Sequence, residues 1–145
     1  MGLSMRVLGV DVGSRRVGLA ISDPSRTLAR PLTTISVDSE DDAVTQLADT
    51  IAELAAEPDG LTAIVVGLPA SLDGSPNDAT RRVNRFVEAL RSRSAIPIVT
   101  EDERLSSREA ESRLAMRERD WRKRKARLDA AAAAVVLQDY LDRSR

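Results

Sequence analysis

Short aliphatic runs separated by a polar, glycine-containing break characterise the beginning of the chain. Residues 6–10 and 17–21 are rich in Val, Leu and Ile, and the segment Gly-Ser-Arg-Arg at 13–16 lies between them. Runs of this kind bounded by Gly and Ser are typical of β-strands joined by a tight turn. With a third run at 32–37, the pattern predicts a β-meander of three strands.

Apolar residues recur at three and four positions in two later segments, as on one face of a helix. The first segment contains Val44, Leu47, Ala48, Ile51 and Leu54, and the second contains Val83, Phe86, Val87 and Leu90. Asp38, Ser39 and Asp41 precede the first of these, where capping residues and acids are favoured. The continuous apolar run at 61–68 predicts a strand buried on both faces, and residues 96–100 predict a fifth strand.

The C-terminal part of the sequence is helical in propensity. It is highly charged from residue 106 to 127 and rich in Ala from 130 to 141. The predicted order is therefore β-β-β-α-β-α-β-α-α, which implies an α/β fold with a mixed five-stranded sheet flanked by helices. The length of 145 residues suits a single domain, 1–145.

Two residue types are absent from the sequence, Cys and His. Their absence excludes disulfides, thiolate zinc sites, cysteine nucleophiles, the Ser-His-Asp triad and imidazole metal sites. Chemistry must then depend on carboxylates, hydroxyls, Lys or Arg, and carboxylates are the preferred ligands of Mg²⁺ and Mn²⁺. The composition thus favours a hard divalent cation as cofactor.

Neither an export signal nor an apolar stretch long enough to cross a bilayer is visible in the sequence, so we expect a cytoplasmic protein with no membrane partner. The formal net charge is −1, so the overall balance does not indicate a nucleic-acid-binding protein. Only the local distribution of charge can do so.

Asp11 directly follows the first predicted strand and precedes Val12 and Gly13. Glycine leaves room for a phosphate or an ion to approach the backbone, which makes Asp11 a candidate ligand. A turn-forming Asp at a strand end explains the same pattern. This segment alone leaves both interpretations open.

A second acidic segment, Glu101-Asp102-Glu103 followed by Arg104, ends the fifth predicted strand. Alternate residues of a strand face opposite sides, so Glu101 and Glu103 would share one face and Asp102 the other. Three consecutive acids repel one another, and a cation or Arg104 would offset that repulsion. A solvated strand end is the competing interpretation.

Asp129 immediately precedes five Ala residues, at the expected start of the last helix. This position favours an N-cap, in which the side chain accepts a hydrogen bond from the first turn. A carboxylate at a helix start can also face the sheet, so capping and catalysis are compatible.

The densest basic run is Arg122-Lys123-Arg124-Lys125, and no acid follows until Asp129. Such a run suits a phosphate backbone, although a solvated helical face is the alternative. Arg15, Arg16 and Arg104 are further candidates for contacts with phosphate, because they flank the candidate acids. Aromatic residues are too scarce to build a platform on which unpaired bases stack.

Four motifs occur together in this sequence. They are DVGSRRVGLA at 11–20, which has the form Asp-x-Gly-x-x-x-x-Gly-x-Ala; VGLP at 66–69 before Asp73-Gly74; DERLSS at 102–107; and DAAAA at 129–133 before VLQ at 136–138. Their order and spacing resemble the YqgF family, the RuvX-type proteins described as Holliday junction resolvases and as pre-16S rRNA nucleases. The resemblance covers nearly the whole chain.

The resemblance implies an RNase H-like core in which three acids converge to hold metal. By position in the motifs these are Asp11, Glu103, with Asp102 as the competing choice, and Asp129. RuvC-type relatives carry an acid on the fourth strand and two acids on the last helix. Here the fourth strand ends in Gly67-Leu68-Pro69 and Ala132 stands one turn after Asp129, so the site is one acid poorer.

The implied function is that of a metal-dependent nuclease, a hydrolase of phosphodiester bonds that uses Mg²⁺ or Mn²⁺. We expect it to act in processing of the 5′ end of pre-16S rRNA, as a monomer or weak homodimer, with RNA favoured over branched DNA. The alternatives are a Holliday junction resolvase, a non-catalytic RNA-binding module, and a phosphate binder like actin or the heat-shock chaperone ATPases.

Overall fold

The computed structural model describes residues 5–71, 73–102 and 121–144, and a five-stranded sheet forms its centre. The strands are β1 (Arg6–Val12), β2 (Arg16–Ser22), β3 (Ala29–Ser36), β4 (Leu61–Leu68) and β5 (Ile98–Asp102), in the spatial order β3-β2-β1-β4-β5. The β1–β2 and β2–β3 pairs are antiparallel, whereas β4 is parallel to both β1 and β5. The mixed five-stranded sheet expected from the sequence is confirmed.

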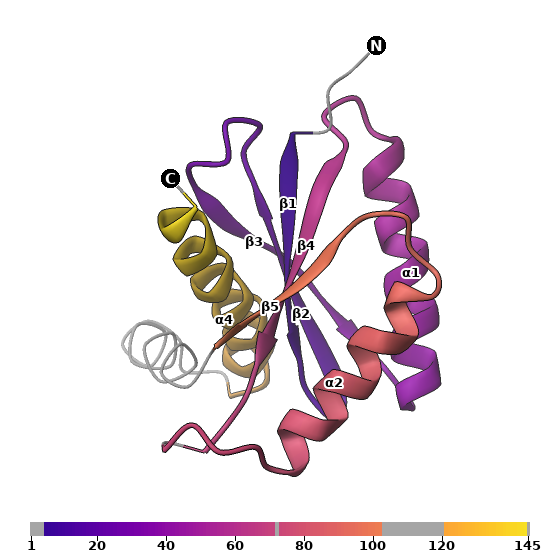
Figure 1. Cartoon of the computed structure of the whole chain (residues 1–145), viewed down its shortest axis with the longest axis vertical. Helices are drawn as coiled ribbons and strands as arrows, with labels where there is room; N and C mark the ends of the chain where they lie inside the picture. The colour runs from indigo at the N-terminus through magenta and orange to yellow at the C-terminus, as the bar shows by residue number, and fades with distance from the viewer. Residues whose placement is uncertain (1–4, 72, 103–120, 145) are drawn as a thin grey trace.

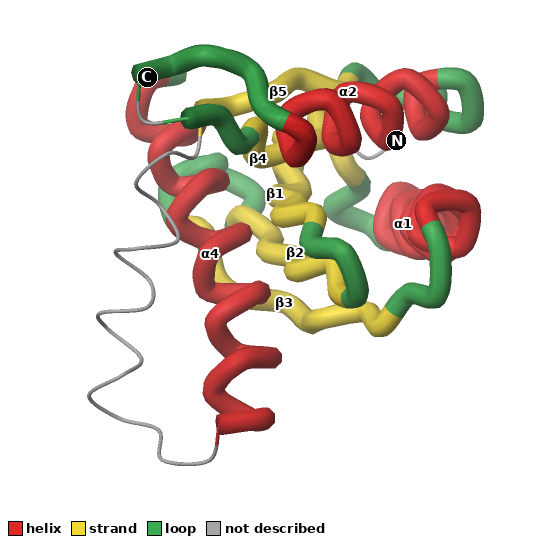
Figure 2. Tube along the Cα trace, turned by 90° about the horizontal axis from the view of Figure 1, so that it is seen from below, coloured by secondary structure: helices red, strands yellow, loops and turns green. Residues whose placement is uncertain are grey.

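Helices cover both faces of this sheet (Figures 1 and 2). The helices α1 (Glu40–Ala56) and α2 (Asp78–Arg91) lie on one face, and α4 (Trp121–Arg143) crosses the other. Ser39 caps α1 as expected, because its side chain accepts a hydrogen bond from the backbone N–H of Asp42. None of the helices in the described part is long and apolar enough to cross a membrane.

Strand alternation divides the apolar residues between two cores. Leu8, Val10 and Val66 belong to the core beneath α1 and α2, whereas Val7 and Val65 pack beneath α4 with Leu137. Each large apolar side chain buried in this way stabilises the fold by roughly 1.5–3 kcal/mol. Because Asp11 alternates with Val7 and Gly9, it belongs to the face that α4 covers.

Several element boundaries differ from those predicted. β3 begins at Ala29 rather than at residue 32, and β5 runs from Ile98 to Asp102 rather than over 96–100. The last helix extends back to Trp121, so the predicted N-cap role of Asp129 is wrong. Arg and Lys are good helix formers, and the helix therefore continues through the basic segment that precedes Asp129.

Asp23 helps to order the β2–β3 connection: its carboxylate accepts hydrogen bonds from the backbone N–H groups of Thr27 and Leu28 and from the Ser25 hydroxyl. These donors, led by Ser25, lower the pKa of Asp23 from 3.8 to about 2. The ionised form is therefore favoured in the folded state.

Asp23→Asn is expected to flatten the acid side of the stability profile. A carboxyl with a lowered pKa in the folded state contributes stability above the unfolded pKa, near 4, and loses it as the pH falls towards about 2. The free energy of unfolding, measured by urea titration from pH 6 down to 2, should therefore fall less steeply in the variant. Parallel profiles for variant and wild type over this window would refute the assignment.

Candidate functional site

Asp11 lies inside β1 rather than after it, and its partner on β2 is Gly18. Directly paired residues on antiparallel strands have Cα atoms about 4.5–5.5 Å apart. The Asp11 carboxylate is thus carried by a central strand, next to a residue that has no side chain. This arrangement replaces the turn-forming interpretation of Asp11, since the turn follows at Gly13, whose N–H donates to the Arg16 carbonyl at 2.8 Å.

Gly18 brings the last helix against the sheet beside Asp11. A Cβ atom at Gly18 would lie 2.0 Å from the backbone carbonyl oxygen of Asp129, a contact that no side chain could make. Glycine in a strand interior often marks such a close approach of another backbone. Asp11 and Asp129, far apart in the sequence, therefore both flank Gly18.

The carboxylate of Asp129 is paired with Arg16. The Arg16 Nε donates to the Asp129 Oδ2 at 2.9 Å, and the two side chains are 28% and 24% exposed. Arg16 opens β2 and alternates with Gly18, so it belongs to the same face. Arg16 was predicted to contact phosphate; in this structure it contacts a predicted metal ligand.

The acids at the end of β5 divide between the two faces of the sheet. Gly67 is in register with Glu101, and Leu68 is in register with Asp102. Since Leu68 packs against the core of α1 and α2, Asp102 alternates to that face, whereas Glu101 shares the face of Asp11 and α4. Glu103 and Arg104 lie outside the described residues, so the predicted role of Glu103 stays a prediction.

Glu101 is a buried acid that sequence reasoning did not single out as a site residue. It forms an ion pair with Arg143, which is in the last turn of α4. Burial raises the pKa of Glu101 more than Arg143 lowers it, and Asp139 adds to the rise. The pair joins the end of β5 to the end of α4, so the strand that leads to Glu103 is anchored to the helix that carries Asp129.

Of the other basic residues that were predicted to contact phosphate, the structure locates those in the β1–β2 turn and in α4, but it does not show such contacts. Arg15 is exposed in the turn between β1 and β2. Residues 122–125 belong to the first turns of α4. Contacts of Arg15, Arg122, Lys123, Arg124 and Lys125 with phosphate stay predictions.

The donor set around Gly18 suits a hard cation. Asp11 and Asp129 supply carboxylate oxygens, the ligand type that Mg²⁺ and Mn²⁺ prefer. Over 5–71, 73–102 and 121–144, no three acidic side chains are grouped closely enough to form a cation site by themselves. Asp11 and Asp129 are therefore the two candidate cation ligands around Gly18 among the described residues, and a third acidic ligand would have to come from outside them.

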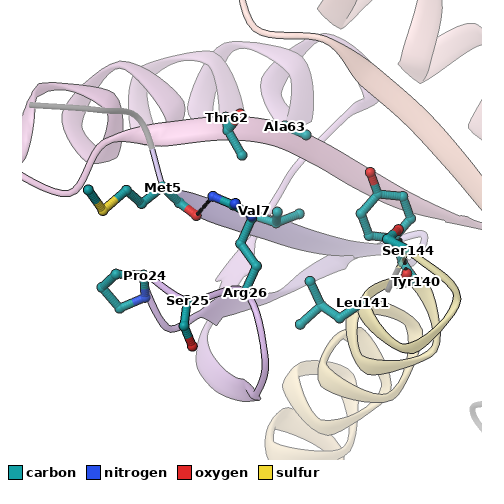
Figure 3. Close-up of a pocket in the computed structure, with 10 residues that line it drawn as sticks. All are labelled: Met5, Val7, Pro24, Ser25, Arg26, Thr62, Ala63, Tyr140, Leu141 and Ser144. Carbon is teal, nitrogen blue, oxygen red and sulfur yellow. Dashed lines mark hydrogen bonds between the residues drawn. The ribbon is translucent and has the colours of Figure 1, made fainter.

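A pocket of about 810 Å³ lies at the other end of β1 (Figure 3). It is formed by the starts of β1 and β4, the β2–β3 connection and the last turns of α4; among its lining residues are Val7, Arg26, Ala63, Tyr140 and Leu141. The Arg26 guanidinium donates to the Met5 carbonyl at 3.2 Å. No predicted site residue lines this pocket, so it is separate from the candidate site.

A solved structure shares the fold of this chain. The chain resembles T. thermophilus RuvC, solved in complex with a Holliday junction substrate, with a TM-score of 0.54 and 16% identity over 97% of this chain and 96% of that one. At this identity the likeness concerns the fold. The RNase H-like fold class expected from the sequence is confirmed.

The family follows from the sequence comparisons. The family described as "RuvX: Holliday junction resolvase" matches residues 5–143. Relatives named "Putative pre-16S rRNA nuclease" are 40% identical over 97% of the chain in Roseiflexus sp. and 43% identical over 96% in Anaeromyxobacter dehalogenans, covering 96% and 98% of those proteins. The chain belongs to the RuvX family, a family of nucleases, which confirms the resemblance drawn from the four motifs.

Proposed function

We propose that this chain is a divalent-metal-dependent nuclease that hydrolyses RNA phosphodiester bonds, with the 5′ region of pre-16S rRNA as its substrate. The observation that supports this proposal is the meeting of Asp11 and Asp129 at Gly18, on the face of an RNase H-like sheet that carries α4. The names of the relatives point to the same substrate class. The site of action would be the cytoplasm, where ribosomal RNA matures.

In this proposal Asp11 and Asp129 hold the cation, and Glu103 completes the set from the segment after β5. A Mg²⁺ or Mn²⁺ ion held by these residues would lower the pKa of a water molecule and offset the negative charge that develops on the phosphate. Asp11 orients its oxygens from a rigid central strand, and Asp129 does so from a helix packed directly on the sheet. Carboxylates on such elements stay in place without a histidine to support them.

Basic side chains would bind the substrate backbone. Arg15 at the β1–β2 turn and the Arg122–Lys125 segment at the start of α4 flank the two acids along the chain, and each phosphate contact would add salt-dependent affinity. Cleavage and binding should therefore weaken as the salt concentration rises. Binding of this type reads the backbone rather than the base sequence.

The decisive experiment incubates the purified protein with Mg²⁺ or Mn²⁺ and three substrates: single-stranded RNA, precursor rRNA with an extended 5′ end, and four-way DNA junctions. We expect metal-dependent shortening of the precursor rRNA, no cleavage with EDTA, and none by Asp129→Asn. Cleavage of the junction alone would support the resolvase activity named for the family. Binding of RNA without fragments would instead identify a non-catalytic module.

A further inference from the structure

Arg16 places a positive charge on a carboxylate that the proposed function assigns to the metal. Its Nε donates to the Asp129 Oδ2 at 2.9 Å, and both side chains are about three-quarters buried. Partial burial reduces the screening of this pair by solvent and makes it stronger than an exposed ion pair. In the absence of metal, Asp129 is therefore already neutralised by a group of this chain.

A divalent cation at Asp129 would compete with this guanidinium for the negative charge of one carboxylate. The Asp129 Oδ2 that accepts the hydrogen bond is one of the two oxygens that could bind the ion, and two positive charges at one carboxylate repel each other. Either the ion binds weakly beside Arg16, or Arg16 moves away. Its backbone at the start of β2 is fixed by the sheet, so movement would be confined to the side chain.

The geometry also leaves Arg16 equipped for a second partner. The ion pair uses Nε, whereas two parallel N–H groups are what a guanidinium needs to bind a phosphate in bidentate fashion. Among the described residues, no other side chain accepts a hydrogen bond from the two terminal nitrogens of Arg16. A substrate phosphate bound to these terminal groups would compete with Asp129 for the guanidinium and offset its positive charge beside that carboxylate.

We propose that Arg16 is a positioning residue that occupies Asp129 in place of the cation until a substrate phosphate draws it away, so that metal and nucleic acid bind cooperatively. This inference rests on the proposed function. Coupling of two ligands is reciprocal: if RNA raises the affinity for the metal, the metal raises the affinity for RNA by the same factor. Arg16 thereby weakens metal binding in the absence of substrate.

The test measures Mn²⁺ binding by calorimetry and by electron paramagnetic resonance, on the full chain, with and without a phosphorothioate-substituted single-stranded RNA. Arg16→Gln should bind Mn²⁺ about fivefold more tightly than the wild type without RNA, and should lose the gain that RNA produces in the wild type. Arg16→Lys keeps the charge and should restore part of this coupling. In cleavage assays at saturating Mn²⁺, Arg16→Gln should raise KM for RNA, because its contact with the substrate phosphate is lost.

The matched control is Arg85→Gln, which removes an Arg–carboxylate pair of the same length, 2.9 Å to Glu40, on the opposite face of the sheet. It should leave Mn²⁺ affinity and its response to RNA unchanged. Unchanged or weaker Mn²⁺ binding by a folded Arg16→Gln variant would overturn this inference but leave the proposed function standing. If the wild type bound no Mn²⁺ even with RNA, the proposed function and this inference would both fail.

Discussion

Asp11→Asn is expected to reduce metal-dependent cleavage more than about 100-fold. Loss of an outer partner of a metal ligand already costs about 10–100-fold in affinity or activity, and loss of a ligand should cost more. The amide keeps the shape of the side chain but removes its charge, at a half-buried position in the central strand β1. The measurement is a single-turnover cleavage rate in Mg²⁺ and in Mn²⁺.

The control for this variant is Asp49→Asn, which neutralises an exposed acid of α1 on the other face of the sheet. It should cleave at the wild-type rate. Circular dichroism should show that both variants are folded, so that the loss of rate is assigned to the site. A folded Asp11→Asn with the wild-type rate would remove Asp11 from the mechanism.

The second large effect is expected from a single methyl group at Gly18. In Gly18→Ala the new Cβ would lie 2.0 Å from the Asp129 carbonyl oxygen, so either β2 or α4 must move. Overpacking costs typically about 1–3 kcal/mol, and a clash between two backbones should lie at or above the upper limit. For a chain of this length each kcal/mol shifts Tm by about 2–4 °C, so we expect Tm to fall by roughly 6–12 °C.

Because the displaced residue is Asp129 itself, Gly18→Ala should also lose cleavage at temperatures where it remains folded. Gly9→Ala is the matched control: its Cβ would lie 2.7 Å from the Leu137 Cβ, so it presses on the same helix but away from Asp129. It should lower Tm while retaining more of the cleavage rate. Equal Tm values for Gly18→Ala and the wild type would show that α4 does not approach β2 as described.

The sheet was predictable because strand alternation is a local property of the sequence. The runs around Val7 and Leu19, and the buried run of β4, are apolar enough to predict strands whatever their neighbours are. The limits of β5 could not be predicted in this way, because the polar residues Glu101 and Asp102 were interpreted as the end of a strand. They extend an edge strand instead, paired on one side with β4.

The residues of the candidate site could be predicted only from the order of the motifs, because the sequence alone does not show which distant residues lie close together. Asp11 and Asp129 were chosen through the family resemblance, whereas the local pattern around Asp129 favoured a cap that the longer α4 does not need. The contacts of Arg16 with Asp129 and of Arg143 with Glu101 join residues far apart in the chain, and no spacing rule predicts them. The close approach at Gly18 had a signal, a glycine inside a strand of Val and Leu.

The shared role of the two acids is tested most directly by Mn²⁺ binding to four proteins: the wild type, Asp11→Asn, Asp129→Asn and the double variant. If both carboxylates hold one ion, each single variant should weaken binding at least about 10-fold, and the double variant should bind little worse than the weaker single one. Wild-type affinity in either single variant, or losses that simply multiply in the double variant, would contradict a common site at Gly18.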